Sequence, residues 1–311
     1  MSVPVARTGI RPRPTSASLG ARWRAGLVPY LFLLPCLVLF LVFRIYPLVN
    51  GLYLSFTDAR LGATEAEFVG LANYAHLAED NRFQISLVNT AVYTFVSLLP
   101  ILGVPLLLAV ILDRGIPLRA FLRSAFFFPF TLSVVTLGIT WLWLLDPVVG
   151  PFNYTLKQLG LPTRSWLGDP STAMGAIIAT SVWWVAGYYL VLYLAALQDI
   201  PNHLYEAAAI DGAGAWRRFW SITLPLLRPI ILLVVVLHII GSFQLFGQVY
   251  VMTQGGPANA TRTIVQTLYE TGFKDLFDFG AASAMSWVLF AIILVVSLVQ
   301  FRLLRGSAEG S

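Results

Sequence analysis

The chain has 311 residues, of which 58% are hydrophobic and only 11% are charged. An average soluble domain has about 25% charged residues, so this chain has too few charges to cover a surface that faces water. The formal net charge of +5 does not indicate nucleic-acid binding, because the 20 Lys and Arg residues are scattered between apolar runs. Cys36 is the only cysteine, which excludes an internal disulfide and argues against structural zinc.

Six uncharged stretches follow one another along the chain, and each reaches the range of about 17–25 residues that a helix needs to cross a bilayer. They cover residues 27–43, 85–112, 124–145, 171–198, 229 to about 252, and 279–301. The sequence therefore predicts an all-α polytopic membrane protein with six transmembrane helices.

Arginines predict the orientation of these helices, because cytoplasmic loops retain positive charge. They gather before the first stretch, in the second and fourth loops and after the last stretch: Arg7, Arg11, Arg13, Arg22, Arg24, Arg114, Arg119, Arg123, Arg217, Arg218, Arg228, Arg302 and Arg305. We therefore expect both termini to be cytoplasmic, which requires an even number of spans. The predicted organisation is a flexible cytoplasmic tail (1–25), a first helix with an external loop (26–84), a five-helix core (85–304) and a short cytoplasmic tail (305–311).

The fourth loop, residues 199–229, is too polar for the membrane and too long for a simple helix hairpin. We expect Asn202 to cap a short alanine-rich helix and Gly212 to end it in a left-handed conformation. A second helix is expected from about residue 215 to 224, with Trp216, Phe219 and Trp220 forming an apolar stripe at i, i+3 and i+4. On composition alone, an amphipathic loop lying on the lipid headgroups remains an alternative.

The spacing of residues in this loop resembles the EAA motif of binding-protein-dependent ABC importers. The matching positions are Glu206-Ala207-Ala208, Asp211-Gly212-Ala213, Phe219, Ile222, Leu224-Pro225 and Pro229. The resemblance implies the fold of a type I ABC importer transmembrane domain, in which this loop docks on a cytoplasmic ATPase. It assigns the docking role to Glu206, Ala207, Ala208, Asp211 and Gly212.

Two further segments resemble the carbohydrate branch of that family. Residues 68–74 are similar to its FVGLxNY element, and residues 253–257, followed by Asn259 and Thr261, are similar to its TxGGP turn. The resemblance points to the maltose-type first permease in the shorter form of glycerol-3-phosphate and sugar importers. The external loop, about residues 51–84, holds no inserted domain, so maltose itself is not implied.

Polar and aromatic residues in the predicted spans are candidates for the solute pathway, because such residues usually face a partner helix or an aqueous cavity. Ser181, Trp184 and Tyr188 share a face of the fourth span. On the fifth span His238 and Ser242 are four residues apart, as are Gln244 and Gln248. Family members that hold sugar in the membrane use matching positions on these two helices.

Alternatives to solute contact remain open at every one of these positions. Hydroxyls and amides also serve as hydrogen bonds between helices, and aromatic rings near a helix end serve as interfacial anchors. Asn89 and Tyr93 form a similar pair on the second span. A pore without a defined solute site, with selectivity left to the external binding protein, is the other alternative.

The chain has no G-x-x-x-x-G-K-[ST] motif, so we expect ATP and Mg²⁺ to bind a partner ATPase and no cofactor to bind this chain. The resemblance implies a bacterial or archaeal plasma membrane location. It also implies four kinds of partner: a second, homologous permease, an ATPase dimer, an extracytoplasmic solute-binding protein and the lipid bilayer.

The alternative function is that of an ion-coupled secondary transporter, which the absence of acidic residues from the six stretches disfavours. A membrane enzyme is disfavoured because no H-E-x-x-H or G-x-S-x-G motif is present. Arg44 is the only arginine near a span interior, which favours a neutral carbohydrate over an anionic solute.

Overall fold

A computed structural model describes residues 19–63, 65–113 and 115–308. Most of the predicted tail 1–25 and the end of the predicted tail 305–311 lie outside these residues. The described chain is helical throughout, and its only extended pairings are two isolated bridges, Thr57 with Phe68 and Arg60 with Asp278. The prediction of an all-α protein is therefore confirmed.

The chain divides into two units, residues 1–53 and 54–311. The described part of the first unit is a nearly continuous helix made of α1 (Leu19–Phe40), a π-helical turn η1 (Leu41–Ile45) and α2 (Tyr46–Leu54), whose last residue belongs to the second unit. From Tyr30 to Leu54 it is long and apolar enough to cross a membrane, and none of the residues in its most apolar window is buried within the chain. Such a helix requires lipid or another protein around it.

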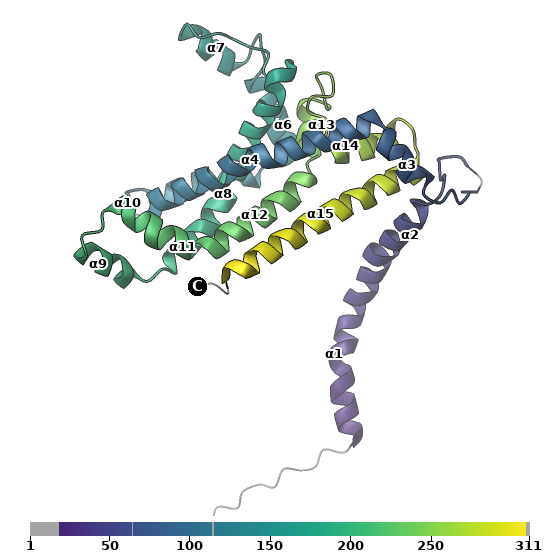
Figure 1. Cartoon of the computed structure of the whole chain (residues 1–311), viewed down its shortest axis with the longest axis horizontal. Helices are drawn as coiled ribbons and strands as arrows, with labels where there is room; N and C mark the ends of the chain where they lie inside the picture. The colour runs from purple at the N-terminus through teal and green to yellow at the C-terminus, as the bar shows by residue number, and fades with distance from the viewer. Residues whose placement is uncertain (1–18, 64, 114, 309–311) are drawn as a thin grey trace, which may run out of the picture. The chain divides into compact units, whose positions relative to one another are not determined.

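The second unit holds the remaining elements, whose arrangement can be followed in Figure 1. In chain order they are α3 (Ala72–Glu79), α4 (Asn81–Asp113), α5 (Arg119–Phe127), η2 (Phe128–Thr131), α6 (Val134–Leu144), α7 (Pro151–Gln158), α8 (Pro170–Gln198), α9 (Asn202–Ile210), α10 (Ala215–Arg218), η3 (Phe219–Thr223), α11 (Leu224–Leu226), α12 (Arg228–Phe243), α13 (Gly247–Met252), α14 (Ile264–Tyr269), η4 (Glu270–Lys274) and α15 (Phe279–Ala308).

Helices α4, α8 and α12 enclose the main core, where Leu190, Tyr193 and Val234 are fully buried. A second cluster joins α12 to α3, α14 and α15 around Ile264 and Met285. These long helices run side by side, with α9 and α10 at one end and α3, α13 and α14 at the other (Figure 1). The two loop systems therefore lie at opposite ends of the same bundle.

Four helices are long and apolar enough to span a membrane, and the number rises to six when two bent helix pairs are each counted as one span. The second pair is bent by 64° at Leu227, which precedes the predicted helix at 229–252. The predicted single helices at 124–145 and 229–252 are both wrong in detail. The first is bent by 100°, because Pro129 lies in the 3₁₀ turn η2 and Ser133 caps a new helix by accepting a hydrogen bond from the Thr136 N–H.

The second predicted helix ends at Phe243, and α13 begins only at Gly247. A helix that ends inside a protein needs partners for its free carbonyl groups. At this break the hydroxyl of Thr263 donates to the Leu245 carbonyl oxygen at 2.7 Å. The break therefore ties the fifth span to the segment that precedes α14.

The residues that resemble the FVGLxNY element organise the loop that precedes α4. The Asn73 side-chain amide donates to the carbonyl oxygens of Ser55 and Thr57 at 2.9 and 2.8 Å. The Tyr74 hydroxyl donates to the Ser55 hydroxyl at 2.7 Å, and its ring lies 5.6 Å from that of Phe56. These contacts give this element a structural role in the unit.

Candidate functional site

Helix α9 carries the residues that resemble the EAA motif, and its start differs from the prediction. Asn202 is the first residue of the helix, whereas Pro201 holds the cap position without a side-chain hydrogen bond. The proline ring fixes φ at −64°, and ψ of 129° makes this residue extended. The expected Asn202 cap is therefore wrong.

The end of α9 agrees with the prediction. Gly212 has a left-handed φ of +79°. The N–H of Ala213 donates to the Ala208 carbonyl oxygen at 2.8 Å, and the N–H of Gly212 donates to the Ala209 carbonyl oxygen at 3.1 Å. This pair of hydrogen bonds is the Schellman motif, which satisfies the last carbonyl groups of a helix and reverses the chain direction.

The surface that α9 presents is uncovered and consists of small, aliphatic and acidic residues. Glu206, Ala207, Asp211 and Gly212 are exposed and Ala208 is partly buried. Ile210, at the end of the helix, is 88% exposed, which is unusual for a large aliphatic residue. Since alanine and glycine allow another backbone to approach closely, this surface is suited to docking.

Within the part of the unit that the structure describes, a single side-chain hydrogen bond and a few apolar contacts hold α9 to the other helices. The hydroxyl groups of Tyr205 and Thr223 lie 2.9 Å apart and share a hydrogen bond. Leu204 and Tyr205 pack against the core formed by α4, α8 and α12. The helix is therefore anchored along one edge while its motif residues remain outside.

The predicted aromatic stripe of the second loop helix is confirmed. The ring of Trp216 lies 6.2 Å from that of Phe219 and 5.6 Å from that of Trp220. The helical stretch begins at Ala215 as predicted, passes through the π-helical turn η3 and continues to Leu226. Trp216 and Trp220 are 75% and 51% exposed, so the stripe is open to lipid or to a partner.

Ser181 and Gln248, predicted on different spans, meet in a buried polar cluster between α8 and α13. The Ser181 hydroxyl donates to Gln248 Oε1 at 2.7 Å. Gln248 Nε2 donates to the Thr180 hydroxyl at 2.6 Å and to the Ile177 carbonyl oxygen at 3.2 Å. Gln248 is only 1% exposed, and its polar atoms are satisfied by protein groups.

His238 and Ser242 lie in a second buried cluster, between α12 and α4. The Thr94 hydroxyl lies 2.8 Å from that of Ser242. His238 Nε2 lies 3.2 Å from the Thr94 carbonyl oxygen, which can only accept, so this nitrogen carries the proton. The Ser97 hydroxyl lies 3.1 Å from the same nitrogen. Hydrogen bonding between helices accounts for both predicted residues.

Trp184 and Tyr188 differ from these residues, because neither side chain forms a hydrogen bond with another group in the described part of the chain. Among the described residues no group accepts a hydrogen bond from the buried Trp184 Nε1. Tyr188 is partly buried, and its ring stacks on Phe130 at 4.8 Å with an angle of 19° between the planes. The predicted face of α8 thus retains one unused donor and one partly open aromatic ring.

Gln244 does not take the position expected of it, whereas Asn89 and Tyr93 both lie on α4, four residues apart as expected. Gln244 lies beyond the end of α12 and is exposed, whereas Gln248 belongs to α13, so the expected shared face is wrong. The helix break described above causes the difference. Asn89 donates to the carbonyl oxygens of Asn259 and Arg262 at 2.7 and 3.0 Å and so fastens the turn that resembles TxGGP.

A buried carboxylate at this end of the bundle is absent from the sequence prediction. Glu270 is 3% exposed and forms ion pairs with Arg82 and Arg262, while Gln266 Nε2 donates to its Oε1 at 3.0 Å. Arg82 and Glu270 are 188 residues apart, so no local pattern links them. By contrast, the spacing of Thr90, Thr94 and Ser97 on one face of α4 could have identified the polar cluster near His238.

Two aspartates outside the spans are held in the charged form by hydrogen bonds. The backbone N–H groups of Val149 and Val148 donate to Asp146, which lowers the pKa of its carboxyl. At the start of α8, the backbone N–H and the hydroxyl of Ser171 lower the pKa of the Asp169 carboxyl. Asp169 is therefore a pH-sensitive N-cap.

Comparison with known proteins identifies the family of this chain. Residues 101–307 match the model of the family described as binding-protein-dependent transport system inner membrane component. The chain is 36% identical over 288 residues to the probable ABC transporter permease protein YurN of Bacillus subtilis, covering 91% of this chain and 98% of that protein.

Two other curated relatives have more specific names. The sn-glycerol-3-phosphate transport system permease protein UgpA of Brucella abortus is 37% identical over 277 residues, which cover 89% of this chain and 94% of that protein. The arabinooligosaccharides transport system permease protein AraP of Bacillus subtilis is 36% identical over 315 residues, which cover 99% of both chains.

Solved structures give the same architecture. A chain in the crystal structure of a bacterial alginate ABC transporter, in complex with an alginate pentasaccharide-bound periplasmic protein, superposes with a TM-score of 0.81. The match covers 91% of this chain and 96% of that chain at 24% sequence identity. At this level of identity the likeness establishes the transmembrane fold of a type I ABC importer and nothing further.

Proposed function

Because the chain belongs to the family of binding-protein-dependent transport system inner membrane components, we propose that it forms half of the translocation pathway of an ATP-driven carbohydrate importer. The names of two relatives, UgpA and AraP, support a solute that is a carbohydrate or a polyol phosphate. The other half would be a second, homologous permease. A solute-binding protein would deliver the solute from outside the membrane, which is consistent with a multi-pass location in a bacterial inner membrane.

The exposed surface of α9 carries the proposed coupling function. The motif residues Glu206, Ala207 and Asp211 stand outside the core, next to an 88% exposed Ile210. A large aliphatic side chain that is exposed among small and acidic residues favours docking of a protein partner. We infer that this partner is one copy of a cytoplasmic ATPase dimer, so that the α9–α10 end of the bundle and both termini lie in the cytoplasm.

In this proposal, closure of the ATPase dimer with ATP and Mg²⁺ bound to it pushes on α9. Tyr205 and Thr223 then pass the displacement to η3, which continues through α11 into α12. Because α12 packs against α4 and α8, the movement reaches the helices that carry the candidate pathway. Alternating access follows when the cavity opens outward on closure and inward after hydrolysis.

The buried polar residues of the described spans favour a neutral solute. They are serine, threonine, histidine and glutamine, and none is Asp, Glu, Lys or Arg. The buried Glu270 lies in η4, outside the spans, and is already paired with two arginines. An ion-coupled transporter is expected to bury acidic groups within its helices, so this distribution supports ATP-driven transport of an uncharged sugar.

Trp184 and Tyr188 are the residues that we propose to contact the solute. An aromatic ring packs well against the C–H face of a sugar, and the free indole N–H of Trp184 can donate to a hydroxyl group. Ser181, His238, Ser242 and Gln248, by contrast, are proposed to hold the helices together through their hydrogen bonds.

Replacement of Ile210 tests the coupling function. Ile210→Asp places a charge on the docking surface without disturbing the core, so the ATPase should no longer copurify with the permease. Ile210→Leu keeps an aliphatic side chain at this position and serves as the control. Normal copurification and normal solute-stimulated ATP hydrolysis by Ile210→Asp would argue against the proposed docking surface.

Uptake measurements in proteoliposomes test the solute assignment. Trp184→Ala and Tyr188→Ala should lower uptake several-fold while the complex still assembles, because each removes a ring from the pathway and neither breaks a hydrogen bond between helices. Ser181→Ala is the comparison for a structural role and should affect thermal stability more than uptake. Full uptake by both aromatic variants rejects the assignment.

A further inference from the structure

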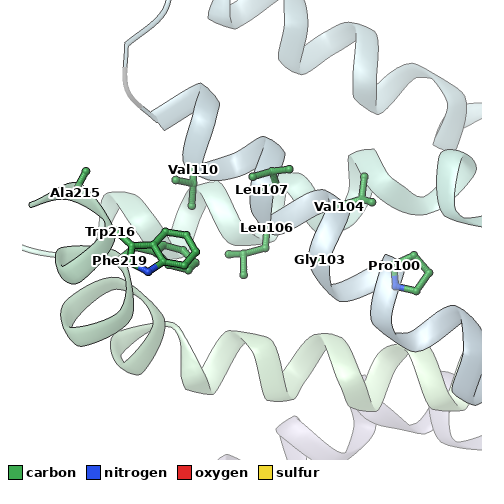
Figure 2. A pocket seen from close by; sticks show the side chains of 9 residues that line it. All are labelled: Pro100, Gly103, Val104, Leu106, Leu107, Val110, Ala215, Trp216 and Phe219. Atoms are coloured by element: carbon green, nitrogen blue, oxygen red, sulfur yellow. The ribbon is translucent and has the colours of Figure 1, made fainter.

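An apolar groove of about 780 Å³ lies between α4 and the beginning of the second loop helix (Figure 2). Its nine lining residues are all apolar or glycine. Leu106, Leu107 and Val110 of α4 line this space together with the rings of Trp216 and Phe219 (Figure 2). The volume falls within the range of about 300–1,000 Å³ that is typical of sites for small organic ligands.

Gly103 keeps the middle of this groove open. A Cβ atom added to Gly103 would have no neighbouring atom within 4 Å. Leu107, one turn further along α4, is 62% exposed, and Trp216 is 75% exposed. The groove is therefore a surface channel with one wall on α4 and the other on the α9–α10 loop.

A second, more polar cavity of about 480 Å³ continues this groove and shares Val110, Ala215 and Phe219 with it. It adds the side chains of Asp113, Asn202 and Arg218. Among the described residues, neither Arg218 nor Asp113 takes part in an ion pair. The continuous groove therefore changes from wholly apolar at Pro100 to a charged end that holds both Arg218 and Asp113.

This gradient of polarity is that of a glycerophospholipid, which has an apolar acyl chain below an anionic phosphate. We propose that the groove binds one phospholipid, with an acyl chain along α4 beside Gly103 and Leu107 and the phosphate at Arg218. Arginine is well suited to this role because its guanidinium group donates several hydrogen bonds to phosphate oxygens. Exposed tryptophans such as Trp216 favour the membrane interface, where the glycerol backbone would lie.

A phospholipid fits this groove better than a transmembrane helix of the second permease does. The apolar side chains of such a helix would fill the part near Pro100 but would bring no counter-charge to Arg218. A lipid supplies both parts in one molecule. The site itself requires only a membrane-embedded chain, whereas an effect of the lipid on coupling would rest on the function proposed above for the α9–α10 loop.

Native mass spectrometry of the assembled complex, supplied with dioleoylphosphatidylglycerol after delipidation, tests this site. Gly103→Phe fills the groove and Arg218→Gln removes the charge at its mouth, so each variant should lose one retained lipid per copy of the chain. Gly241→Phe places the same ring at another open glycine, on α12, and should retain the wild-type number. Arg217→Gln removes the same charge from an exposed neighbour outside the groove and should also retain it.

A photo-crosslinking amino acid at position 107 identifies the occupant directly. Crosslinks to phospholipid support the proposal, and crosslinks to the second permease overturn it. Lipid retention that is unchanged in both Gly103→Phe and Arg218→Gln also overturns it. Because retention is measured without ATP hydrolysis or transport, a failed lipid site is distinguishable from a failure of the α9 docking surface.

Discussion

Replacing Gly212 by alanine isolates the backbone conformation that ends α9. The added Cβ atom would meet no atom within 4 Å, so the variant introduces no clash. The remaining cost is that of a left-handed φ of +79° for a residue with a side chain, about 1–2 kcal/mol. A free energy of this size changes an equilibrium about 5–30-fold. The equilibrium constant for opening the Schellman motif at the end of α9 should therefore rise about 5–30-fold relative to the wild type.

Hydrogen exchange measures this opening at the amide of Ala213, which donates to the Ala208 carbonyl oxygen in the closed loop. We expect its exchange to be about 5–30-fold faster in Gly212→Ala, the change in equilibrium that follows from 1–2 kcal/mol. Solute-stimulated ATP hydrolysis by the reconstituted complex should fall at the same time, because α9 no longer holds the proposed docking surface in one orientation. Global thermal unfolding should change little, since the loop lies outside the core.

Gly214 provides a matched control two residues further along the chain. It is also free of neighbours within 4 Å, but its φ of −66° and ψ of 167° are accessible to alanine. The Gly214→Ala variant should therefore show wild-type hydrogen exchange at the Ala213 amide. The complex that contains it should hydrolyse ATP at the wild-type rate. Gly212→Asn should be intermediate, because asparagine tolerates the left-handed region better than alanine. Equal exchange rates in Gly212→Ala and Gly214→Ala would refute the reasoning.

Three further predictions concern stability. Glu270→Gln leaves two arginines without their shared buried carboxylate. It should lower the free energy of unfolding by an amount toward the lower end of about 3–5 kcal/mol, because one arginine is partly exposed. Asp275→Asn, at a more exposed pair, should lower it by less than about 1 kcal/mol in the same thermal unfolding assay. Since the pKa of the Asp169 carboxyl is lowered in the folded state, its cap stabilises α8 above the unfolded pKa and is lost as the pH falls through the folded pKa. The stability difference between wild type and Asp169→Ala should therefore shrink on acidification, and a constant difference would contradict the capping role. Gly187→Ala would push a Cβ atom into the α5 backbone and should destabilise the chain by about 1–3 kcal/mol or more, whereas Gly175→Ala, in an open part of α8, should be stabilising by about 0.5–1 kcal/mol.

Local signals in the sequence predicted the α9–α10 loop well. The left-handed end at Gly212 and the contacts between the rings of Trp216, Phe219 and Trp220 both follow from residues within one or two helical turns of each other. Hydropathy predicted the apolar stretches for the same reason, because membrane insertion depends on composition over a short window. The docking roles of Glu206 and its neighbours remain a prediction from the family resemblance.

Helix breaks and long-range polar contacts could not be predicted in this way. The stretches 124–145 and 229–252 are uncharged throughout, so hydropathy does not detect the bend in the first or the end of the helix at Phe243 in the second. Pro129 was a visible signal for the bend, but the break after Phe243 involves Thr263, which lies 18 residues beyond the carbonyl group that it satisfies. The helical spacing of Gln244 and Gln248 consequently predicted a shared face that does not exist.

The two ends of the bundle are fastened very differently, and this difference bears on how a permease could transmit movement. At the α13–α14 end, Asn89, Thr90 and Thr263 each bond the backbone of a distant segment, and Glu270 joins two arginines from different elements. At the opposite end, one hydrogen bond between side chains and the packing of Leu204 and Tyr205 hold α9 to the core. A force applied to α9 therefore meets little local resistance until it reaches α12, whose far end is fixed. Weakening the fixed end, as in Glu270→Gln, should accordingly reduce transport at a given rate of ATP hydrolysis, whereas weakening the α9 end should reduce the stimulation of hydrolysis itself.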